Sequence, residues 1–219
     1  MTRTGRLIVL VGPAGAGKTT LAHRLVEASP QTRGFSVSHT TRPMRAGEVD
    51  GRDYHFVPRE AFEALVAQQG FAEWAEVHGN LYGTSKAEIE RHWAAGRDIL
   101  FDIDIVGAHN LWQSYPAATR LAFVLPPGWD ALKDRLQRRG SETPETLRRR
   151  LRTARRELNG LVASPAQWSV VINDQLDSAV QTAAQLFADA TPAATDLSHH
   201  AVVQAFVQAA NADPLAQEA

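Results

Sequence analysis

The chain has 219 residues, 44% of them hydrophobic and 21% charged, so its composition is that of a globular protein and not of a disordered one. The 23 lysines and arginines nearly balance the 24 aspartates and glutamates, and the formal net charge of -1 argues against nucleic acid as a partner. The chain has no cysteine, which excludes disulfides and thiolate metal sites.

The first apolar run is too short to direct the chain to or through a membrane. It covers only residues 7–11, whereas a signal peptide or a membrane helix needs a longer run. We therefore expect a cytoplasmic protein with no membrane partner. The length fits one α/β domain with inserted subdomains, or two small domains.

Short apolar runs alternate with helical patterns along the chain. The apolar runs predict strands at residues 7–11, 35–38, 99–103, 121–125 and 170–172. Helices are predicted from Lys18, over about 106–114 and over about 177–188. Strands that alternate with helices predict an α/β fold of three layers around a parallel sheet.

Two segments interrupt this alternation and divide the core into about 5–38, 96–139 and 159–187. Residues from about 39 to 95 contain strand candidates at 54–56 and 71–77 and two helical runs, which indicates an inserted substrate-binding subdomain. Residues from about 140 to 158 are rich in arginine and indicate a mobile helical lid. In the tail from residue 188 to 219 we expect one short helix, over about 201–210.

Residues 12–19 read Gly-Pro-Ala-Gly-Ala-Gly-Lys-Thr and match the P-loop pattern G-x-x-x-x-G-K-[ST] in full. Glycines let successive backbone N–H groups face phosphate oxygens, and the N-terminus of the following helix adds a favourable dipole. Lys18 can reach the β- and γ-phosphates, and the Thr19 hydroxyl can bind Mg²⁺. Because the motif follows an apolar strand and begins a helix, we predict a P-loop NTPase fold that binds ATP.

Two arginines in the segment Ser38–Glu48 suggest an anion site. Arg42 and Arg45 lie three residues apart on either side of Pro43, which stiffens the turn. Paired guanidinium groups suit a phosphate dianion. Taken alone, the segment is equally consistent with a charged surface loop.

Five segments that follow the P-loop resemble, in this order, the motifs of guanylate kinases, over roughly residues 5 to 187. They are Ser38–Glu48, Gly51–Tyr54, Gly79–Thr84, Asp102–Asp104 and Arg135–Gly140. The resemblance implies a transferase that moves the γ-phosphate of ATP to GMP, and also to dGMP, with Mg²⁺ as the cofactor. It also implies a GMP-binding insert and a helical lid.

The resemblance assigns eight residues to the GMP site. The phosphate would be held by Arg42, Arg45, Tyr54 and Tyr82, and guanine would be recognised by Ser38, Glu73, Thr84 and Asp104. The chemistry agrees, because a carboxylate can accept from N1–H and N2–H of guanine while a hydroxyl donates to O6. Adenine carries an acceptor at N1 and would face the carboxylate unpaired.

The resemblance also implies an ATP site and a catalytic set. The ATP site comprises Gly12, Pro13, Ala14, Gly15, Ala16, Gly17, Lys18, Thr19, Thr20 and Asn173. The catalytic residues are Lys18, Arg42, Arg135, Arg139 and Arg150. Thr19 and Asp102 would hold Mg²⁺, partly through water, although Asp102 could instead cap a helix. The other five arginines between Arg148 and Arg156 are expected on the surface.

Ala14, Val106 and Gln175 depart from the family pattern. Two other functions of proteins with this architecture also stay open. A ribose 1,5-bisphosphate phosphokinase would share the P-loop but would not need a guanine site. A non-catalytic, guanylate kinase-like module that binds protein partners would have lost its ATP site. The number of subunits also stays open, between a monomer and a homo-oligomer.

Overall fold

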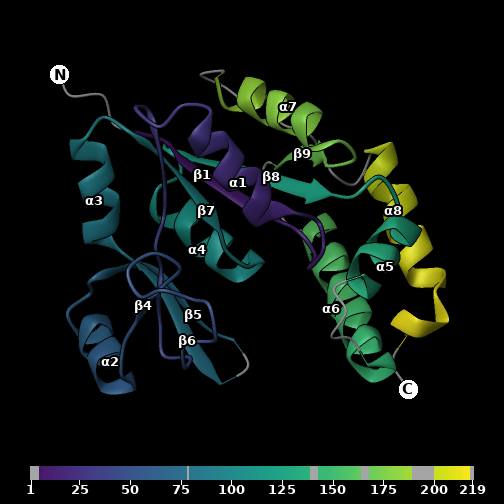
Figure 1. Ribbon diagram of the computed structural model, residues 1–219, viewed down its shortest axis with the longest axis horizontal. Helices are drawn as coiled ribbons and strands as arrows, with labels where there is room; N and C mark the ends of the chain where they lie inside the picture. Colours follow the sequence, from purple (N-terminus) through teal and green to yellow (C-terminus); the bar gives the residue numbers. More distant parts are fainter. Residues whose placement is uncertain (1–4, 78, 139–142, 164–167, 189–199, 218–219) are drawn as a thin grey trace. The chain divides into compact units, whose positions relative to one another are not determined.

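The computed structural model describes residues 5–77, 79–138, 143–163, 168–188 and 200–217. The chain divides into two compact units, whose helices and strands are labelled in Figure 1. The first unit comprises Met1–Val9 and Val26–Thr119, and the second comprises Leu10–Leu25 and Arg120–Ala219.

Parallel strands form the core of the fold. In the first unit β2 (Arg33–Phe35) pairs in parallel with β7 (Asp98–Asp102). In the second unit β8 (Thr119–Leu125), which begins one residue before the unit boundary, pairs in parallel with β9 (Trp168–Ile172). The division between the units falls within β1 (Leu7–Val11). All five residues of β1 are buried, which explains its unbroken apolar run. The predicted α/β fold with a parallel sheet is confirmed.

The helices of the second unit follow their apolar periodicity. They are α1 (Lys18–Glu27), which continues two residues past the unit boundary, α5 (Trp129–Gln137), α6 (Pro144–Val162), α7 (Leu176–Ala188) and α8 (Ala201–Ala212), with the 3₁₀ turn η2 (Pro214–Ala216). The arginine-rich helix α6 begins at Pro144 because the Thr143 side chain accepts a hydrogen bond from the Thr146 backbone N–H. The apolar residues Leu147, Leu151, Ala154, Leu158 and Leu161 are buried along one face of α6.

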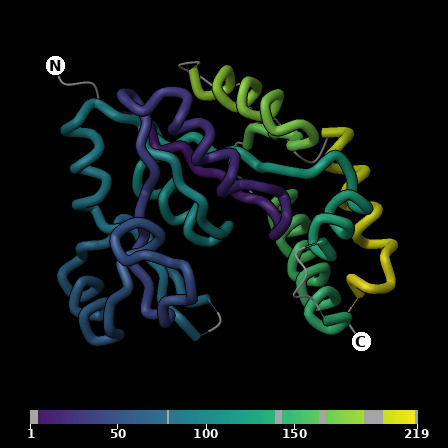
Figure 2. Tube along the Cα trace, in the orientation of Figure 1, coloured from purple at the N-terminus to yellow at the C-terminus, as the bar shows by residue number. Residues whose placement is uncertain are grey.

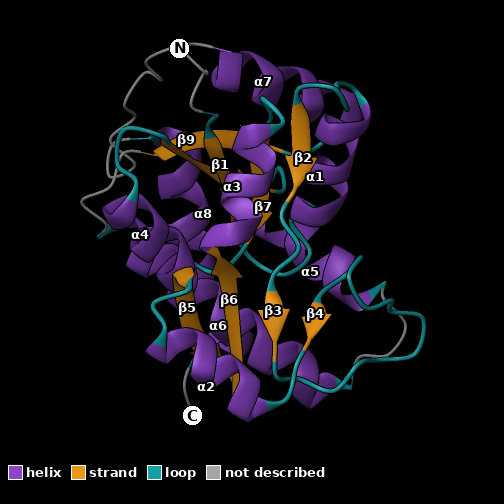
Figure 3. Ribbon diagram, turned by 90° about the vertical axis from the view of Figure 1, so that its left-hand side faces the viewer, coloured by secondary structure: helices purple, strands orange, loops and turns teal. Residues whose placement is uncertain are grey.

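A second, four-stranded sheet lies in the first unit. It contains β3 (His39–Thr40), β4 (His55–Phe56), β5 (Phe71–Val77) and β6 (Asn80–Ser85), in the order β4-β3-β6-β5 (Figure 3). Helix α2 (Arg59–Ala67) buries Phe62, whose ring stacks on Phe71 with centroids 4.3 Å apart. Two further helices, α3 (Lys86–Ala94) and α4 (Ile105–Ser114), complete this unit.

The strand predicted at residues 35–38 was partly wrong. Strand β2 ends at Phe35, and β3 begins at His39 in the other sheet. The Ser36 backbone N–H still bonds the carbonyl of Leu100 in the parallel sheet, whereas the Ser38 carbonyl accepts from the His55 N–H in the four-stranded sheet. The pattern Phe-Ser-Val-Ser at residues 35–38 predicts one strand, but the backbone passes from one sheet to the other within it. In the described part of the chain, every helix is too short or too polar to cross a membrane.

Candidate active site

The phosphate loop joins β1 to α1 in the second unit. Gly12 has a φ of 149°, and a Cβ at this position would lie 2.2 Å from the carbonyl oxygen of Val124. Gly17 has a φ of 87°, and a Cβ there would lie 2.4 Å from Nδ2 of Asn173. Glycine is therefore needed at both positions for backbone conformation and for space. These two glycines let the chain turn tightly between β1 and α1.

Two residues predicted to bind ATP, Lys18 and Asn173, contact the phosphate loop, and the predicted catalytic residue Arg135 contacts Asn173. Lys18 Nζ donates to the carbonyl oxygens of Gly12, at 2.7 Å, and Pro13, at 3.3 Å. Asn173 is buried, and its Nδ2 donates to the Ala16 carbonyl oxygen at 2.8 Å. The Arg135 guanidinium donates to the Asn173 carbonyl oxygen at 2.7 Å. Asn173 thus holds the phosphate loop through the Ala16 carbonyl oxygen, and Arg135 in turn bonds to Asn173.

The four residues predicted to read guanine lie together in the first unit, although 66 positions separate the first from the last. Ser38 Oγ and Thr84 Oγ1 are 3.2 Å apart, and the Thr84 backbone N–H donates to Glu73 Oε1 at 3.0 Å. Strand register explains this contact, because Glu73 on β5 pairs with Thr84 on β6. Ser38, Glu73, Thr84 and Asp104 are called the carboxylate cluster below.

Helix α4 brings Asp104 to the same place. It packs on β5, and its first turn is capped by Asp104, whose Oδ1 accepts from the Gly107 N–H at 2.7 Å. A Cβ at Gly107 would lie 2.9 Å from Glu73 Oε2 and 3.5 Å from Asp104 Oδ1, so both carboxylates flank this glycine. The alternative expectation, that Asp102 caps a helix, was wrong because Asp104 fills that position.

The environment of Glu73 disfavours its charge. Its side chain is only 6% exposed. Burial raises the pKa of Glu73 to about 7, with a further increase from the Asp104 charge and an opposing decrease from its hydrogen bonds with Thr84. Near neutral pH this carboxyl group therefore exchanges between its two protonation states. A ligand that offers two N–H donors would stabilise the charged form.

Arg42 lies among aromatic rings on the same unit. Its guanidinium carbon is 5.5 Å from the centre of the Tyr54 ring and 5.6 Å from that of Phe56. The rings of Tyr54 and Tyr82 meet edge to face, with centroids 6.0 Å apart. Burial, and next the Asp102 charge, raise the pKa of Tyr54, so this hydroxyl keeps its proton and can donate to an anion. Arg42, Arg45, Tyr54 and Tyr82 are called the arginine–tyrosine cluster below.

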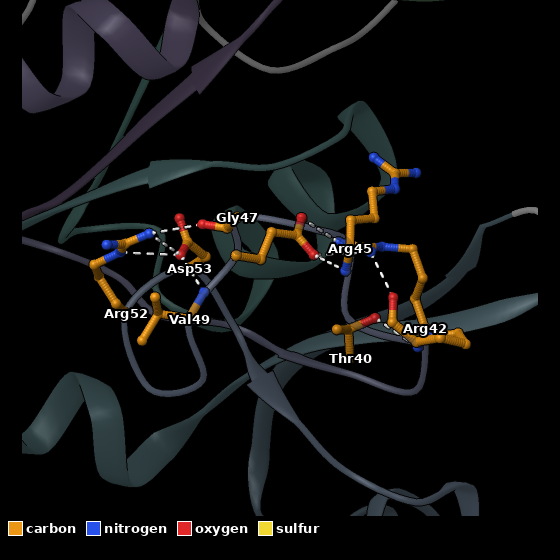
Figure 4. Close-up of polar contacts among 9 residues, drawn as sticks. Thr40, Arg42, Arg45, Gly47, Val49, Arg52 and Asp53 are labelled. Atoms are coloured by element: carbon orange, nitrogen blue, oxygen red, sulfur yellow. Dashed lines mark hydrogen bonds and ion pairs between the residues drawn. The ribbon is translucent and has the colours of Figure 1, made fainter.

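Glu48 connects the two arginines, and the sequence interpretation did not assign it a role. Arg42 donates to Glu48 Oε1 at 2.8 Å and to Oε2 at 3.1 Å, while the Arg45 backbone N–H donates to Oε2 at 2.7 Å. The Arg45 side chain is exposed and extends away from these contacts (Figure 4). Hydrogen bonds, first of all from Arg42, lower the pKa of Glu48. The sequence does carry a signal for this role. Glu48 lies three residues after Arg45, and a carboxylate at that spacing can accept from the Arg45 backbone N–H across a turn.

The sequence interpretation also assigned no role to Glu88. This carboxylate supports the backbone beside Ser38, one member of the carboxylate cluster. Its Oε1 accepts from the backbone N–H of Val37, the residue before Ser38, at 3.3 Å. It also bonds Arg91 at 2.8 Å and His92 at 3.2 Å. Burial raises the pKa of Glu88, but the hydrogen bonds with His92 and Arg91 outweigh burial and lower the pKa to about 2. Glu88 therefore stays charged and helps to fix the backbone that carries Ser38.

The remaining polar candidates are the two residues predicted to hold Mg²⁺ (Thr19 and Asp102), Thr20 of the ATP site, and two catalytic arginines. Thr19 and Thr20 are exposed in the first turn of α1, and Asp102 is half-buried at the end of β7. Arg150 is half-buried on α6, whereas Arg139 lies outside the described residues. Among the described residues, no group of three or more histidines and carboxylates is arranged to hold a metal ion.

One arginine expected on the surface has a definite partner. Arg155 is half-buried, and it donates to Asn211 Oδ1 at 2.9 Å and to the Ala216 carbonyl oxygen at 3.1 Å. These partners could not be predicted, because they belong to the C-terminal tail, for which the sequence offered no recognisable counterpart.

A P-loop on a parallel α/β sheet binds the phosphates of a nucleotide, and the two clusters of the first unit offer partners for a base and for a second phosphate. The class of protein with these parts is the P-loop nucleoside-monophosphate kinases.

Comparison with known proteins identifies the family. The guanylate kinase family model matches residues 4–190. A guanylate kinase from Nocardia farcinica is 46% identical over 188 residues, which are 85% of this chain and 95% of that protein. One from Anaeromyxobacter dehalogenans is 49% identical over 80% of this chain and 76% of that protein. The crystal structure of guanylate kinase from Anaplasma phagocytophilum has a TM-score of 0.65 at 30% identity, covering 84% of this chain and 86% of that one. The chain belongs to the guanylate kinase family.

Proposed function

We propose that this protein transfers the γ-phosphate of ATP to GMP, and also to dGMP, giving ADP and the nucleoside diphosphate. The observation that carries the proposal is the carboxylate cluster, in which buried Glu73 is bonded to the Thr84 N–H and Thr84 Oγ1 lies 3.2 Å from Ser38 Oγ. Such a cluster matches guanine, because the carboxylate accepts from N1–H and N2–H while a hydroxyl donates to O6. Asp104 Oδ2 can accept from the same donor edge, since its hydrogen bond to Gly107 uses Oδ1.

The arginine–tyrosine cluster holds the phosphate of GMP in this proposal. Arg42 is held in place by Glu48 and by the rings beside it, so binding costs little of its conformational freedom. Arg45 extends from the same turn, and the Tyr54 and Tyr82 hydroxyls add neutral donors. Two cations and two hydroxyls together can neutralise and orient a phosphate dianion.

Catalysis then depends on alignment and charge neutralisation. The attacking oxygen of GMP is already anionic at neutral pH, so no residue has to act as a general base. Lys18 exchanges its contacts with the Gly12 and Pro13 carbonyl oxygens for phosphate oxygens of ATP. Arg135, Arg139 and Arg150 neutralise charge on the transferred group and exclude water from it.

The chain also offers oxygen donors that suit magnesium. The Thr19 hydroxyl and the Asp102 carboxylate are hard ligands, and two protein ligands with water and substrate phosphates are usual for Mg²⁺. When bound, the ion would withdraw charge from the phosphate oxygens of ATP.

An assay across several acceptors tests the proposal. With Mg·ATP as donor, GMP should be phosphorylated fastest, dGMP should also be accepted, and AMP and ribose 1,5-bisphosphate should react slower by at least about 10³-fold in kcat/KM, because their atoms do not match the carboxylate cluster. A preference for ribose 1,5-bisphosphate would replace the proposed acceptor. A folded protein with no turnover on any acceptor would favour a binding module instead.

Glu48 should affect the binding of GMP more than the chemical step. Replacing Glu48 with alanine should raise the KM for GMP about tenfold with a smaller change in kcat, because Arg42 and the Arg45 backbone lose their shared anchor. Glu48→Gln keeps one oxygen acceptor but turns its NH₂ group toward a donor, so its KM for GMP should lie between those of the wild type and Glu48→Ala. Steady-state kinetics with GMP varied at saturating ATP measures both. An unchanged KM in Glu48→Ala would show that Arg42 is held without Glu48.

A further inference from the structure

The C-terminal tail forms an ordered element of the second unit beyond the part that matches the family. The family model ends at residue 190, whereas α8 and η2 occupy Ala201–Ala212 and Pro214–Ala216. Both elements pack on α6, and α8 also contacts α5; Figure 2 shows the tail in yellow beside these helices. The side chains of Val203, Phe206, Ala210 and Ala216 are at most 2% exposed. The tail therefore has an apolar face that is fully covered within this unit.

Asp213 attaches the tail to α5. Its Oδ2 accepts from Trp129 Nε1 at 2.7 Å and from Lys133 Nζ at 3.1 Å. The Trp129 ring also meets the edge of Phe206, with centroids 5.8 Å apart. Burial raises the pKa of Asp213, but hydrogen bonds from Trp129, the Leu215 N–H and Lys133 outweigh burial and lower it. Asp213 is thus a charged acceptor for two side chains of one helix.

Asn211 and the end of the tail attach to α6. Asn211 Oδ1 accepts from Arg155 Nε at 2.9 Å and from Asn159 Nδ2 at 3.2 Å. Arg155 also donates to the Ala216 carbonyl oxygen at 3.1 Å, which closes the attachment around η2. One short segment, residues 200–217, therefore bonds to both α5 and α6.

We propose that residues 200–217 are a brace that fixes α6 against α5, and that Asp213 and Asn211 are positioning residues for Arg135 and Arg150. This inference rests on the proposed function, in which those two arginines neutralise the transferred phosphoryl group. Lys133 and Arg135 lie two residues apart on α5, and Arg150 and Arg155 lie five apart on α6, or about 7.5 Å along its axis. A helix moves as a stiff unit. The tail contacts at Lys133 and Arg155 therefore restrict the positions that Arg135 on α5 and Arg150 on α6 can take. A displacement of about 1 Å at a reacting centre can cost about 10²-fold in rate.

Point variants of the full chain test the brace. Asp213→Ala and Asn211→Ala should each lower kcat by about threefold to tenfold and leave the KM for GMP unchanged, because the proposed GMP residues all belong to the other unit. Asp213→Asn keeps an oxygen acceptor for Trp129 and should recover part of the loss. Gln208→Ala, at an exposed position of α8, is the matched control and should behave as the wild type.

The dependence on Arg150 separates positioning from general stability. In an Arg150→Ala background, Asn211→Ala should lower kcat much less than it does in the wild type, because Asn211 holds α6 through Arg155 and the α6 arginine that it positions is already missing. Equal losses in both backgrounds would overturn the positioning role. So would a wild-type kcat in Asp213→Ala and Asn211→Ala with only a lower melting temperature.

Amide hydrogen exchange tests the brace without relying on turnover. Exchange across residues 144–162 should be faster in Asp213→Ala than in the wild type and in Gln208→Ala. Unchanged exchange would overturn the brace even if the protein phosphorylates GMP. If the wild type does not phosphorylate GMP, the proposed function fails, while faster exchange in α6 would still identify the tail as its support.

Discussion

Replacing Glu73 with glutamine should lower kcat/KM for GMP by about 10²- to 10³-fold, because a buried donor would then face a donor of guanine. The Thr84 N–H donates to Glu73 Oε1, so the oxygen of a glutamine would remain with Thr84 and its NH₂ group would turn toward N1–H and N2–H. The same variant should discriminate less between GMP and AMP. The measurement is steady-state kinetics with each nucleotide at saturating Mg·ATP.

Glu76→Gln is the matched control for this substitution. Glu76 lies three residues further along the same strand, β5, and is exposed. It should keep the wild-type kcat/KM for GMP. If Glu73→Gln also kept it, guanine recognition could not depend on the carboxylate cluster, and the acceptor proposed here would have to be given up.

The raised pKa of Glu73 predicts opposite effects of pH on ligand binding and on stability. GMP binding needs the ionised form, so with a pKa of about 7 the Kd for GMP should be about tenfold higher at pH 6 than at pH 8. Because a phosphate monoester also titrates near pH 6, the pH dependence in Glu73→Gln must be subtracted. Calorimetric titration at each pH measures both proteins. An identical pH dependence in both would exclude Glu73 as the titrating group.

The free energy of unfolding should change with pH in the opposite direction and decrease as the pH rises. The pKa of Glu73 is 4.5 in the unfolded chain and about 7 in the folded one, so the folded state binds the proton more tightly. The stabilisation that results is fully present below about pH 4.5 and is lost as the pH rises through about 7. In the absence of GMP, the free energy of unfolding of Glu73→Gln should therefore decrease less across this range than that of the wild type. Urea denaturation at several pH values measures the difference.

Replacing Lys18 with alanine should lower kcat by about 10³-fold or more, because no other side chain of the P-loop pattern can supply a positive charge to the β- and γ-phosphates. The Kd for GMP in the absence of ATP should not change, since Lys18 and the proposed GMP residues belong to different units. Lys86→Ala, at an exposed position of α3, is the control for loss of a lysine. Retention of most of the activity in Lys18→Ala would mean that the loop does not act on the transferred phosphate.

The P-loop, the buried strands and most of the helices could be predicted because their signals are local. The spacing of Gly12, Gly17 and Lys18 specifies one turn of backbone between a strand and a helix, and a continuous apolar run specifies a strand covered on both faces. A helical segment was predicted over about 140–158, and α6 occupies Pro144–Val162, where the Thr143 cap sets its start. Each of these signals lies within a few consecutive residues.

The sequence by itself therefore determined the α/β class, the phosphate loop and, through resemblance, the candidate residues. Only the tertiary structure decided their partners, because partners depend on strand register and helix packing between distant segments. Glu73 meets Thr84 through the pairing of β5 with β6, and Asp104 rather than Asp102 caps the helix that packs on β5. Arg155 meets Asn211 across 56 positions of the chain. Such contacts leave no periodic signal, since each is set by how two already formed elements fit together.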